Sequence, residues 1–493
     1  MLPPIVLLPL YLNYLTPADY GIQAIVTITM DIIGVIISLC ITGVLSRFYF
    51  EYDEQKDRNE VLSTLLISFS ILSLPSLLLL STQSRNLSNY LLGSSELYHY
   101  FLIVFSAFWF RNVYAIGCDY LRVKERSIAY VVVSLFFLVI QIGLNVLFIA
   151  VYRIGVTGIF LSSLITSALF ATLITIPIVV RIGFRFSKQK FIEMAKFSAP
   201  LIVSSLSAIV VNSSDRFFVK HFAGLDLTGI YSIAYRLGSS IHTFITASFM
   251  QYWLPHRFAI YKQLNAKEIY SRFLIYYLMT VLFFGLLLSC TSRDILLIIS
   301  KPSFYSGYKI VPIIVLSYVV FGLQYYLNIG ILIKKKTKYI AYVDSSIGVI
   351  NILLNFLLIS KYGAYGAAYA TLGSFILKIL CLNFISQKLY PIHYDYTKIY
   401  KLIIATSIIY ILSSMISYPD EYYLYIEDFQ QHAYALRLIG VQFLVWHSLV
   451  VLIFPPLLYL IRFFDENELR YAKQLCLKMK GKLLKASPEQ SNP

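Results

Sequence analysis

The sequence predicts an all-α polytopic membrane protein of about 14 transmembrane helices, with two parallel-repeat six-helix bundles, two C-terminal helices and a V-shaped central cleft. Three observations carry this prediction: an apolar composition, an alternation of basic loops and an internal repeat. Of 493 residues, 58% are hydrophobic and 13% are Asp, Glu, Lys or Arg, against about a quarter charged in average soluble domains. This composition excludes a globular enzyme on a membrane anchor, a disordered chain and a nucleic-acid-binding domain.

Apolar runs between polar breaks give the predicted spans. A spanning helix uses about 20 apolar residues, and the chain divides into fourteen such runs. The first run lacks the basic region and small-residue cleavage site of a signal peptide, so we expect it to be a span. The predicted spans are residues 1–15, 21–45, 61–81, 99–117, 129–151, 156–180, 198–222, 227–253, 273–291, 309–333, 340–359, 364–386, 401–418 and 438–461.

The basic residues predict the orientation of these spans. The even-numbered connections and the C-terminal tail hold 29 Lys and Arg residues, whereas the odd-numbered connections hold 8. Because cytoplasmic loops carry an excess of Lys and Arg, we expect both termini in the cytoplasm. The net charge of +16 then reflects topology rather than a surface that binds nucleic acid.

Short motifs recur at offsets between 208 and 212 residues, each at the same topological place in the two halves. An offset of six spans is even, so both halves enter the membrane in the same sense and face each other across an axis along the membrane normal. A substrate cleft between two such bundles suits alternating access. The matched motifs are Tyr20-Gly21 with Thr228-Gly229, Ser46-Arg47-Phe48 with His256-Arg257-Phe258, Ile128-Ala129-Tyr130-Val131 with Ile340-Ala341-Tyr342-Val343, Leu144-Asn145 with Leu354-Asn355, and Gly155-x-x-Gly158 with Gly363-x-x-Gly366.

The repeat divides the chain into four predicted parts. These are an N-terminal six-helix bundle (1–190), a C-terminal six-helix bundle (191–395), two additional transmembrane helices (396–461) and a basic cytoplasmic tail (462–493). The five cysteines are scattered and form no CxxC or Cys/His cluster, so we expect no metal or other cofactor beyond a coupling ion.

Ionisable residues inside spans are costly unless they face a cavity or a partner, so they are functional candidates. Asp31 lies in the second span, Arg111 in the fourth, Asp215 and Arg216 at the end of the seventh, and Arg236 in the eighth. Cations outnumber carboxylates in this set. A positive cleft favours an anionic cargo, and the guanidinium fork suits phosphate in particular.

Each of these residues also has a structural interpretation. Asp215 and Arg216 point about 100° apart on a helix, so each needs its own partner, and Arg236 is a candidate partner for Asp215 at an outer gate. Arg47 marks the inner mouth of its helix, where positive-inside anchoring competes with cargo contact. Asp31 is either an ion-coupling carboxylate or a fixed partner of Arg111 or Arg236.

Four segments resemble a known family of membrane proteins. They are Leu15-Thr16-Pro17-Ala18-Asp19-Tyr20-Gly21; Arg47-Phe48-Tyr49-Phe50-Glu51-Tyr52; Asp215-Arg216-Phe217-Phe218 with Ala223-Gly224 and Gly229-Ile230-Tyr231-Ser232; and Asn351 and Leu354-Asn355 with Tyr362 to Thr371. Their order and spacing, over residues 1 to 385, resemble the Wzx-type lipid-linked oligosaccharide flippases. These belong to the polysaccharide transport family of the multidrug/oligosaccharidyl-lipid/polysaccharide exporter superfamily, whose members usually have further residues before this start.

This resemblance implies a transporter rather than an enzyme. The implied cargo is an undecaprenyl-diphosphate-linked oligosaccharide, such as an O-antigen (lipopolysaccharide), capsule or exopolysaccharide repeat unit. It would be flipped from the cytoplasmic to the periplasmic leaflet of the bacterial inner membrane by ion-coupled antiport. The implied partners are membrane lipids, a polysaccharide polymerase and a chain-length regulator. The cationic lumen of the family maps onto Arg47, Arg111, Arg216 and Arg236, and we expect Asp31 and Asp215 to couple H⁺ or Na⁺.

Two other function classes compete with this one. A drug or cation exporter of the same superfamily would need a negative cleft, which the sequence does not offer. A polysaccharide polymerase or a lipid-linked-sugar glycosyltransferase generally needs a sizeable outer loop with catalytic groups, and the longest outer loop here is about 19 residues. We therefore expect a flippase.

Overall fold

The computed structural model describes residues 6–38, 41–419, 422, 425–426, 428–466 and 468–470. The first residues of the first predicted span (1–5) and most of the predicted basic tail (471–493) lie outside them. Every regular element in the described part of the chain is a helix, which confirms the all-α prediction.

The described helices form two arms and a connector between them. The N-arm holds α3 (Pro17–Ile37), α4 (Ile41–Tyr49), α5 (Gln55–Thr82), α6 (Ser84–Leu92), η1 (Ser95–Leu97), α7 (Tyr98–Val123), α8 (Ser127–Asn145), η2 (Val146–Val151), α9 (Val156–Phe170), η3 (Ala171–Thr175) and α10 (Ile176–Ile182). The C-arm holds α12 (Asp215–Ile241), η4 (His242–Thr246), α13 (Ala247–Ile260), α14 (Ala266–Ile299), η5 (Pro302–Lys309), α15 (Val311–Leu327), α16 (Ile329–Ile333), α17 (Lys338–Leu389), α18 (Tyr396–Ser414), α20 (Phe429–Val451) and α21 (Phe454–Leu460). The connector is α11 (Lys188–Ser213), and α2 (Leu8–Tyr14) precedes the N-arm.

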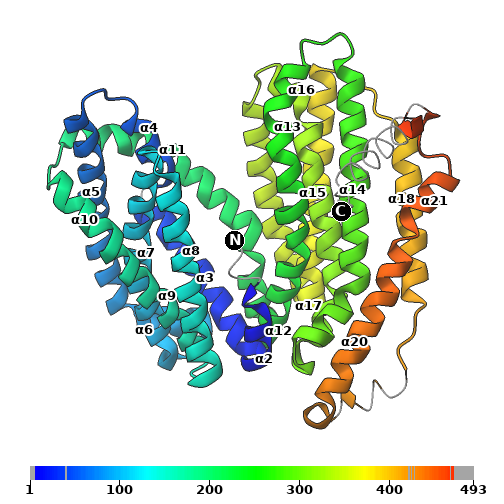
Figure 1. The fold of residues 1–493 in the computed structure, drawn as a ribbon, viewed down its shortest axis with the longest axis horizontal. Coiled ribbons are helices and arrows are strands. Elements are labelled where there is room, and N and C mark those ends of the chain that lie inside the picture. The colour runs from blue at the N-terminus through cyan, green and yellow to red at the C-terminus, as the bar shows by residue number, and fades with distance from the viewer. Residues whose placement is uncertain are drawn as a thin grey trace, which may run out of the picture.

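The two arms form a V, as Figure 1 shows. They meet at one end, where α2, α3 and α12 lie, and they diverge toward the other; we call these the joined end and the open end. The connector α11 runs from the tip of the N-arm down to the joined end. Helices α18, α20 and α21 cover the side of the C-arm that faces away from the N-arm.

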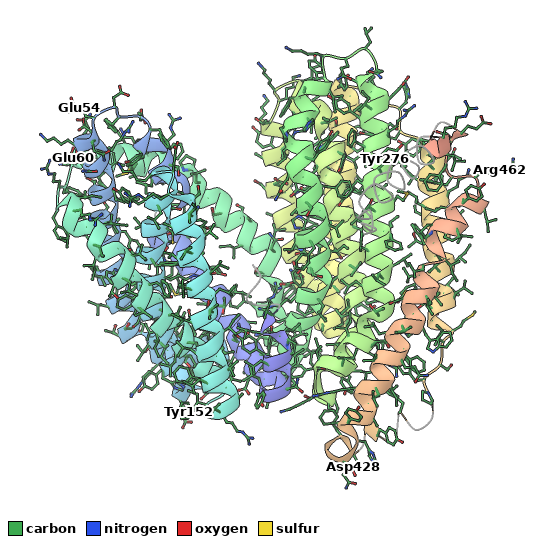
Figure 2. All side chains as sticks on the ribbon, in the orientation of Figure 1. Glu54, Glu60, Tyr152, Tyr276, Asp428 and Arg462 are labelled. Atoms are coloured by element: carbon green, nitrogen blue, oxygen red, sulfur yellow. The ribbon has the colours of Figure 1, made fainter. Side chains whose placement is uncertain are left out.

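The loops sort to the two ends of the V as the sequence predicts. Figure 2 shows Glu54, from the second connection, at the tip of the N-arm, whereas Tyr152 and Asp428, from odd-numbered connections, lie at the joined end. The basic connections therefore lie at the open end of the molecule.

Eleven described helices are long and apolar enough to cross a membrane. Two of these helical stretches are very long: Lys188–Ile260, which runs from α11 through α13 (73 residues), and Lys338–Leu389, which is α17 (52 residues). Each contains a glycine outside helical geometry, Gly224 (φ 83°) in the first and Gly363 (φ 54°) in the second. Each glycine lies between two predicted spans. The layout of fourteen spans remains a prediction, because the described residues do not cover all of the first span.

Each arm has its own hydrophobic core, and a third cluster joins them. In the C-arm, Trp253, Tyr277 and Tyr326 pack ring against ring. The third cluster, at the joined end, combines Tyr20 and Ile159 of the N-arm with Ile233 and Leu296 of the C-arm. The arms are thus separate packing units that share buried apolar surface at one end.

The start of α3 shows how the opening motif of the sequence acts locally. The side chain of Thr16 accepts a hydrogen bond from the backbone N–H of Asp19 (3.1 Å), and the Asp19 carboxylate accepts one from the N–H of Thr16 (3.0 Å). This is a capping box, and Pro17 occupies the first helical position, where no backbone donor is needed. The motif therefore fixes where α3 begins at the joined end.

The internal repeat is visible in the backbone. Gly155 and Gly363, 208 residues apart, share an unusual conformation (φ 61°, ψ −139° and φ 54°, ψ −131°). Glu125 and Lys335, 210 residues apart, are both left-handed, with φ 57° and 56°. Left-handed backbone is rare outside glycine, so its recurrence at matched places supports the duplication.

The glycine turns give the first testable prediction. A Cβ atom at Gly155 would meet no heavy atom within 4 Å, so the cost of Gly155→Ala is conformational, about 1–3 kcal/mol at such a backbone geometry. We expect a lower Tm in detergent. The matched control is Gly143→Ala in the helical interior of α8, also in open space, where alanine favours the helix. Equal Tm values for the two variants would contradict the assigned turn.

Candidate functional site

The joined end is held by a close crossing of α3 and α12. A Cβ atom at Gly21 would lie 2.2 Å from the carbonyl oxygen of Leu225, and one at Gly229 would lie 1.9 Å from that of Pro17. The contact is reciprocal, because Gly21 and Gly229, like Pro17 and Leu225, are 208 residues apart. Two equivalent helices therefore touch backbone to backbone across the pseudo-two-fold axis, and only glycine fits at either position.

Arg236 lies on α12, about two turns beyond this crossing. Its guanidinium carbon is 5.4 Å from the ring centroid of Tyr20. Its Nη1 atom is buried and has no hydrogen-bond partner in the described part of the protein. The neighbouring Tyr11 hydroxyl donates to Asn145 instead (2.9 Å). Arg236 therefore has an aromatic neighbour but an unsatisfied donor near the α3–α12 crossing.

Asp215 and Arg216 form a buried pair with each other. The Arg216 guanidinium donates to the Asp215 carboxylate (2.9 Å) and to the carbonyl of Asn212 (2.7 Å). It lies 4.0 Å from the ring centroid of Tyr235, and the Tyr231 hydroxyl donates to the other Asp215 oxygen (2.5 Å). The expectation that the two neighbours need different partners, with Arg236 serving Asp215, is wrong. Asp215 opens α12, and the long arginine side chain folds back over that helix start.

Asp31 and Arg111 lie on adjoining helices of the N-arm and are both exposed in the protein. Their helices touch where Gly34 meets the ring of Phe108; Asp31 is three residues before that contact and Arg111 three residues after it. Arg111 acts electrostatically on Asp31, yet neither residue has an ion pair within 4.0 Å among the described side chains. A fixed salt bridge from Asp31 to Arg111 or Arg236 is thus not formed here.

The two arginines at the predicted inner mouths of the repeat have similar surroundings. Arg47 is exposed, with its guanidinium 5.8 Å from the ring centroid of Phe197 on the connector. Arg257 lies 4.8 Å from the ring centroid of Phe258, and its Nε atom is buried without a hydrogen-bond partner among the described residues. Guanidinium groups stacked on aromatic rings keep donors free for a ligand.

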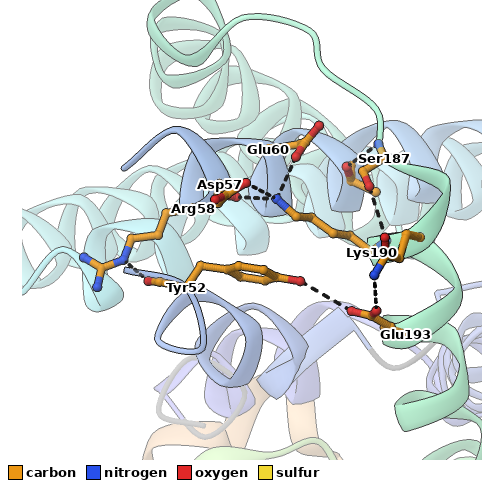
Figure 3. A network of polar contacts seen from close by, with 9 residues as sticks. Tyr52, Asp57, Arg58, Glu60, Ser187, Lys190 and Glu193 are labelled. Atoms are coloured by element: carbon orange, nitrogen blue, oxygen red, sulfur yellow. Dashed lines mark hydrogen bonds and ion pairs between the residues drawn. The ribbon is translucent and has the colours of Figure 1, made fainter. Parts of the chain in front are cut away.

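A polar network attaches the connector to the tip of the N-arm, as Figure 3 shows. Lys190 is buried and donates to the carboxylates of Asp57 (2.9 Å) and Glu60 (2.6 Å). The Tyr52 hydroxyl faces Glu193 at 3.4 Å; burial and this carboxylate raise the pKa of Tyr52. The start of α11 therefore moves with the N-arm, while its other end continues into α12 of the C-arm.

Sequence reasoning missed several buried or half-buried carboxylates, among them Asp344 and Asp294. Asp344 of α17 forms an ion pair with Lys378 (2.8 Å). Asp294 of α14, which is 0% exposed, accepts hydrogen bonds from Tyr418 and from His447 (2.7 Å). A scan for ionisable residues in spans would have found Asp344, but the partners of Asp294 lie more than 120 residues away and leave no local signal.

Comparison with known families decides which family this is. A family model described as polysaccharide biosynthesis protein matches residues 1–261, more than half of the chain. The chain belongs to this family. The matched region covers the N-arm, the connector and the first helices of the C-arm, and it includes both glycines of the α3–α12 crossing, Gly21 and Gly229. No match was found among curated proteins.

Solved structures share the fold. A structure of the lipid II flippase MurJ in an inward closed conformation superposes with a TM-score of 0.71 at 17% sequence identity, covering 94% of this chain and 97% of that one. An inward-facing MATE family multidrug resistance transporter of the MOP superfamily gives 0.62 at 13% identity, covering 78% and 93%. The predicted family and the all-helical membrane-protein fold are thus confirmed.

The glycine crossing gives the second prediction. Gly229→Ala places a methyl group against the backbone at Pro17, so we expect the joined end to loosen. The loosening can be measured with Ser232→Cys, in a chain whose native cysteines are replaced by serine. Ser232 lies one turn from Gly229 and is 7% exposed, so its labelling rate reports how often the joined end opens. We expect faster labelling by a membrane-impermeant maleimide, by at least about tenfold if the contact loses 1.4 kcal/mol.

The matched control is Gly373→Ala, whose Cβ would meet only Leu354 at an ordinary 3.8 Å. Its labelling rate should equal that of the parent chain. Unchanged labelling in Gly229→Ala would show that the crossing does not keep the joined end shut.

Proposed function

We propose that this protein flips an undecaprenyl-diphosphate-linked oligosaccharide between membrane leaflets by alternating access. The observation that carries the proposal is a pair of exposed charges in the N-arm, Asp31 and Arg111, that lie on the adjoining helices α3 and α7 and form no ion pair with any described residue. The family, and a fold shared with a lipid II flippase, support this substrate class. The basic open end would face the cytoplasm of a bacterium, at the inner membrane, and both termini would lie there.

In this mechanism arginine holds the diphosphate. Arg111 and Arg47 are exposed on the N-arm, and Arg236 has an unsatisfied donor near the gate. Each guanidinium can donate two parallel hydrogen bonds to a phosphate and keeps its charge at any physiological pH. We assign Arg216 a structural role in this proposal, because Asp215, Asn212 and Tyr235 already occupy its guanidinium.

Asp31 is the proposed coupling residue. A carboxylate among apolar helices favours its neutral form unless a cation compensates it, so its charge can follow the side to which it is open. Binding H⁺ or Na⁺ at Asp31 would leave Arg111 free for the diphosphate, and loss of that ion would let Arg111 turn to the carboxylate. Asp215 has two partners already, and we assign it to the gate. The flipped product would then pass to a polymerase and its chain-length regulator.

The charges near the gate weigh against a drug or cation exporter, the second candidate. Arg236 has no carboxylate within ion-pair distance among the described residues, and Asp215 is neutralised by Arg216. A cationic drug would meet net positive charge at the bottom of the V.

The third prediction concerns Arg111. In proteoliposomes with a labelled lipid-linked oligosaccharide diphosphate, Arg111→Gln should slow flipping by at least about tenfold, the loss of one charge-assisted bidentate contact. The control is Arg85→Gln, an exposed arginine of α6 at the joined end. Equal flipping by both variants would overturn the assignment of Arg111.

The same assay tests the coupling role of Asp31. Asp31→Asn should remove the response of flipping to an imposed H⁺ or Na⁺ gradient while substrate binding persists, since Arg111 is intact. A variant that still responds fully to the gradient would exclude Asp31 as the coupling residue.

A further inference from the structure

The C-arm contains a charged cavity toward the joined end, separate from the α3–α12 crossing. Its volume is about 340 Å³, and it lies between α14, η5, α15 and α18. Two cations line it, Arg293 and Lys309, together with the hydroxyls of Ser292 and Ser413 and the ring of Tyr418. Because α18 covers the side of the C-arm away from the N-arm (Figure 1), this cavity lies away from the side of the C-arm that faces the N-arm.

A buried hydrogen-bonded cluster fixes Arg293 at this cavity. Asp294 receives hydrogen bonds from Tyr418 on one oxygen and from His447 on the other, so it ties α14 to α20 and to the segment after α18. The guanidinium carbon of Arg293 then lies 3.8 Å from the ring centroid of Tyr418 and 4.6 Å from that of Tyr422. Stacking on two rings restricts the position of the guanidinium.

The charge of this cavity is positive within the described residues. Neither Arg293 nor Lys309 has a carboxylate within 4.0 Å there, and the Nε atom of Arg293 is buried without a hydrogen-bond acceptor. Asp294 is adjacent in sequence, but its two oxygens are used by Tyr418 and His447. A fixed guanidinium with an unused donor, next to an exposed ammonium, matches a phosphate group.

An apolar cavity continues from the charged one toward the middle of the membrane. Its volume is about 520 Å³, and Leu282, Leu286 and Val319 are among its aliphatic lining. The two cavities share Ser289 and Pro312 as well as Tyr410. Along α14 the charged cavity is nearer the joined end, so the order from the membrane surface inward is cationic and then apolar. That order matches an amphiphile with an anionic head.

We propose that these two cavities together bind one anionic phospholipid from the leaflet at the joined end. Its phosphate contacts Arg293 and Lys309, and an acyl chain occupies the apolar cavity beside α14 and α15. A free phosphate would leave the apolar cavity without an occupant. This site does not depend on the proposed transport function, because it lies beside α18, on the side of the C-arm that faces away from the N-arm.

Native mass spectrometry of the detergent-purified protein with added phosphatidylglycerol tests the site. The parent chain should retain one phosphatidylglycerol, and the double variant Arg293→Gln/Lys309→Gln should retain at least about tenfold less, because it loses two charge-assisted hydrogen bonds. Lys361→Gln, at an exposed lysine beside the Gly363 turn, is the matched control and should retain the lipid as the parent does.

A second variant keeps the test independent of Arg293, whose loss could disturb the fold. Leu316→Trp fills the apolar cavity from its rim, where Leu316 is 46% exposed, and should also reduce retention at an unchanged Tm. Equal retention by all variants overturns the site. Displacement of the lipid by inorganic phosphate alone identifies a free-anion site and overturns the lipid assignment, as does equal retention of zwitterionic phosphatidylcholine. Retention of lipid-linked oligosaccharide diphosphate in preference to phosphatidylglycerol overturns it in favour of the transported lipid.

Discussion

The backbone contact between Gly21 and Gly229 is the constraint on which the rest of the structure depends. It brings two equivalent helices together at a distance that no side chain allows, and it closes the V at the joined end. The arms otherwise have separate cores, so they are free to diverge away from this contact. Helix packing through small residues is a normal means of association in membranes, and here it holds the two arms together at the joined end.

Some charged residues have ion-pair or hydrogen-bond partners and others have none among the described residues. We assign the first group to helix packing and the second to ligand binding. Arg216 and Asp294 are surrounded by aromatic rings and hydrogen-bond partners, and they stabilise helix contacts. Arg111 and Asp31 are exposed and unpaired in the described residues, although a membrane protein gains most by pairing such groups. Exposed charges that stay unpaired within the described part of the N-arm have the properties that a ligand site requires.

The sequence was informative where the physics is local or repeated. The Thr16–Asp19 capping box, the turn glycines Gly155 and Gly363 and the placement of basic loops follow from short motifs and loop charge. Hydrogen bonds and ion pairs between distant parts of the chain could not be predicted in this way. The helical rule of 100° between neighbours failed for Asp215 and Arg216, because a long side chain at a helix start can fold back to its neighbour. The Asp294–His447 contact joins helices 153 residues apart, and no periodicity encodes it.

The most direct test of the account is the distance between the open ends of the two arms during transport. Spin labels at Glu54 and Leu264, both exposed loop residues, report that distance in liposomes. If the arms approach each other at the open end when they bind a lipid diphosphate, adding lipid-linked oligosaccharide diphosphate should shift the distances toward shorter values, whereas the dephosphorylated lipid should not. A distance distribution that both lipids leave unchanged would contradict the account.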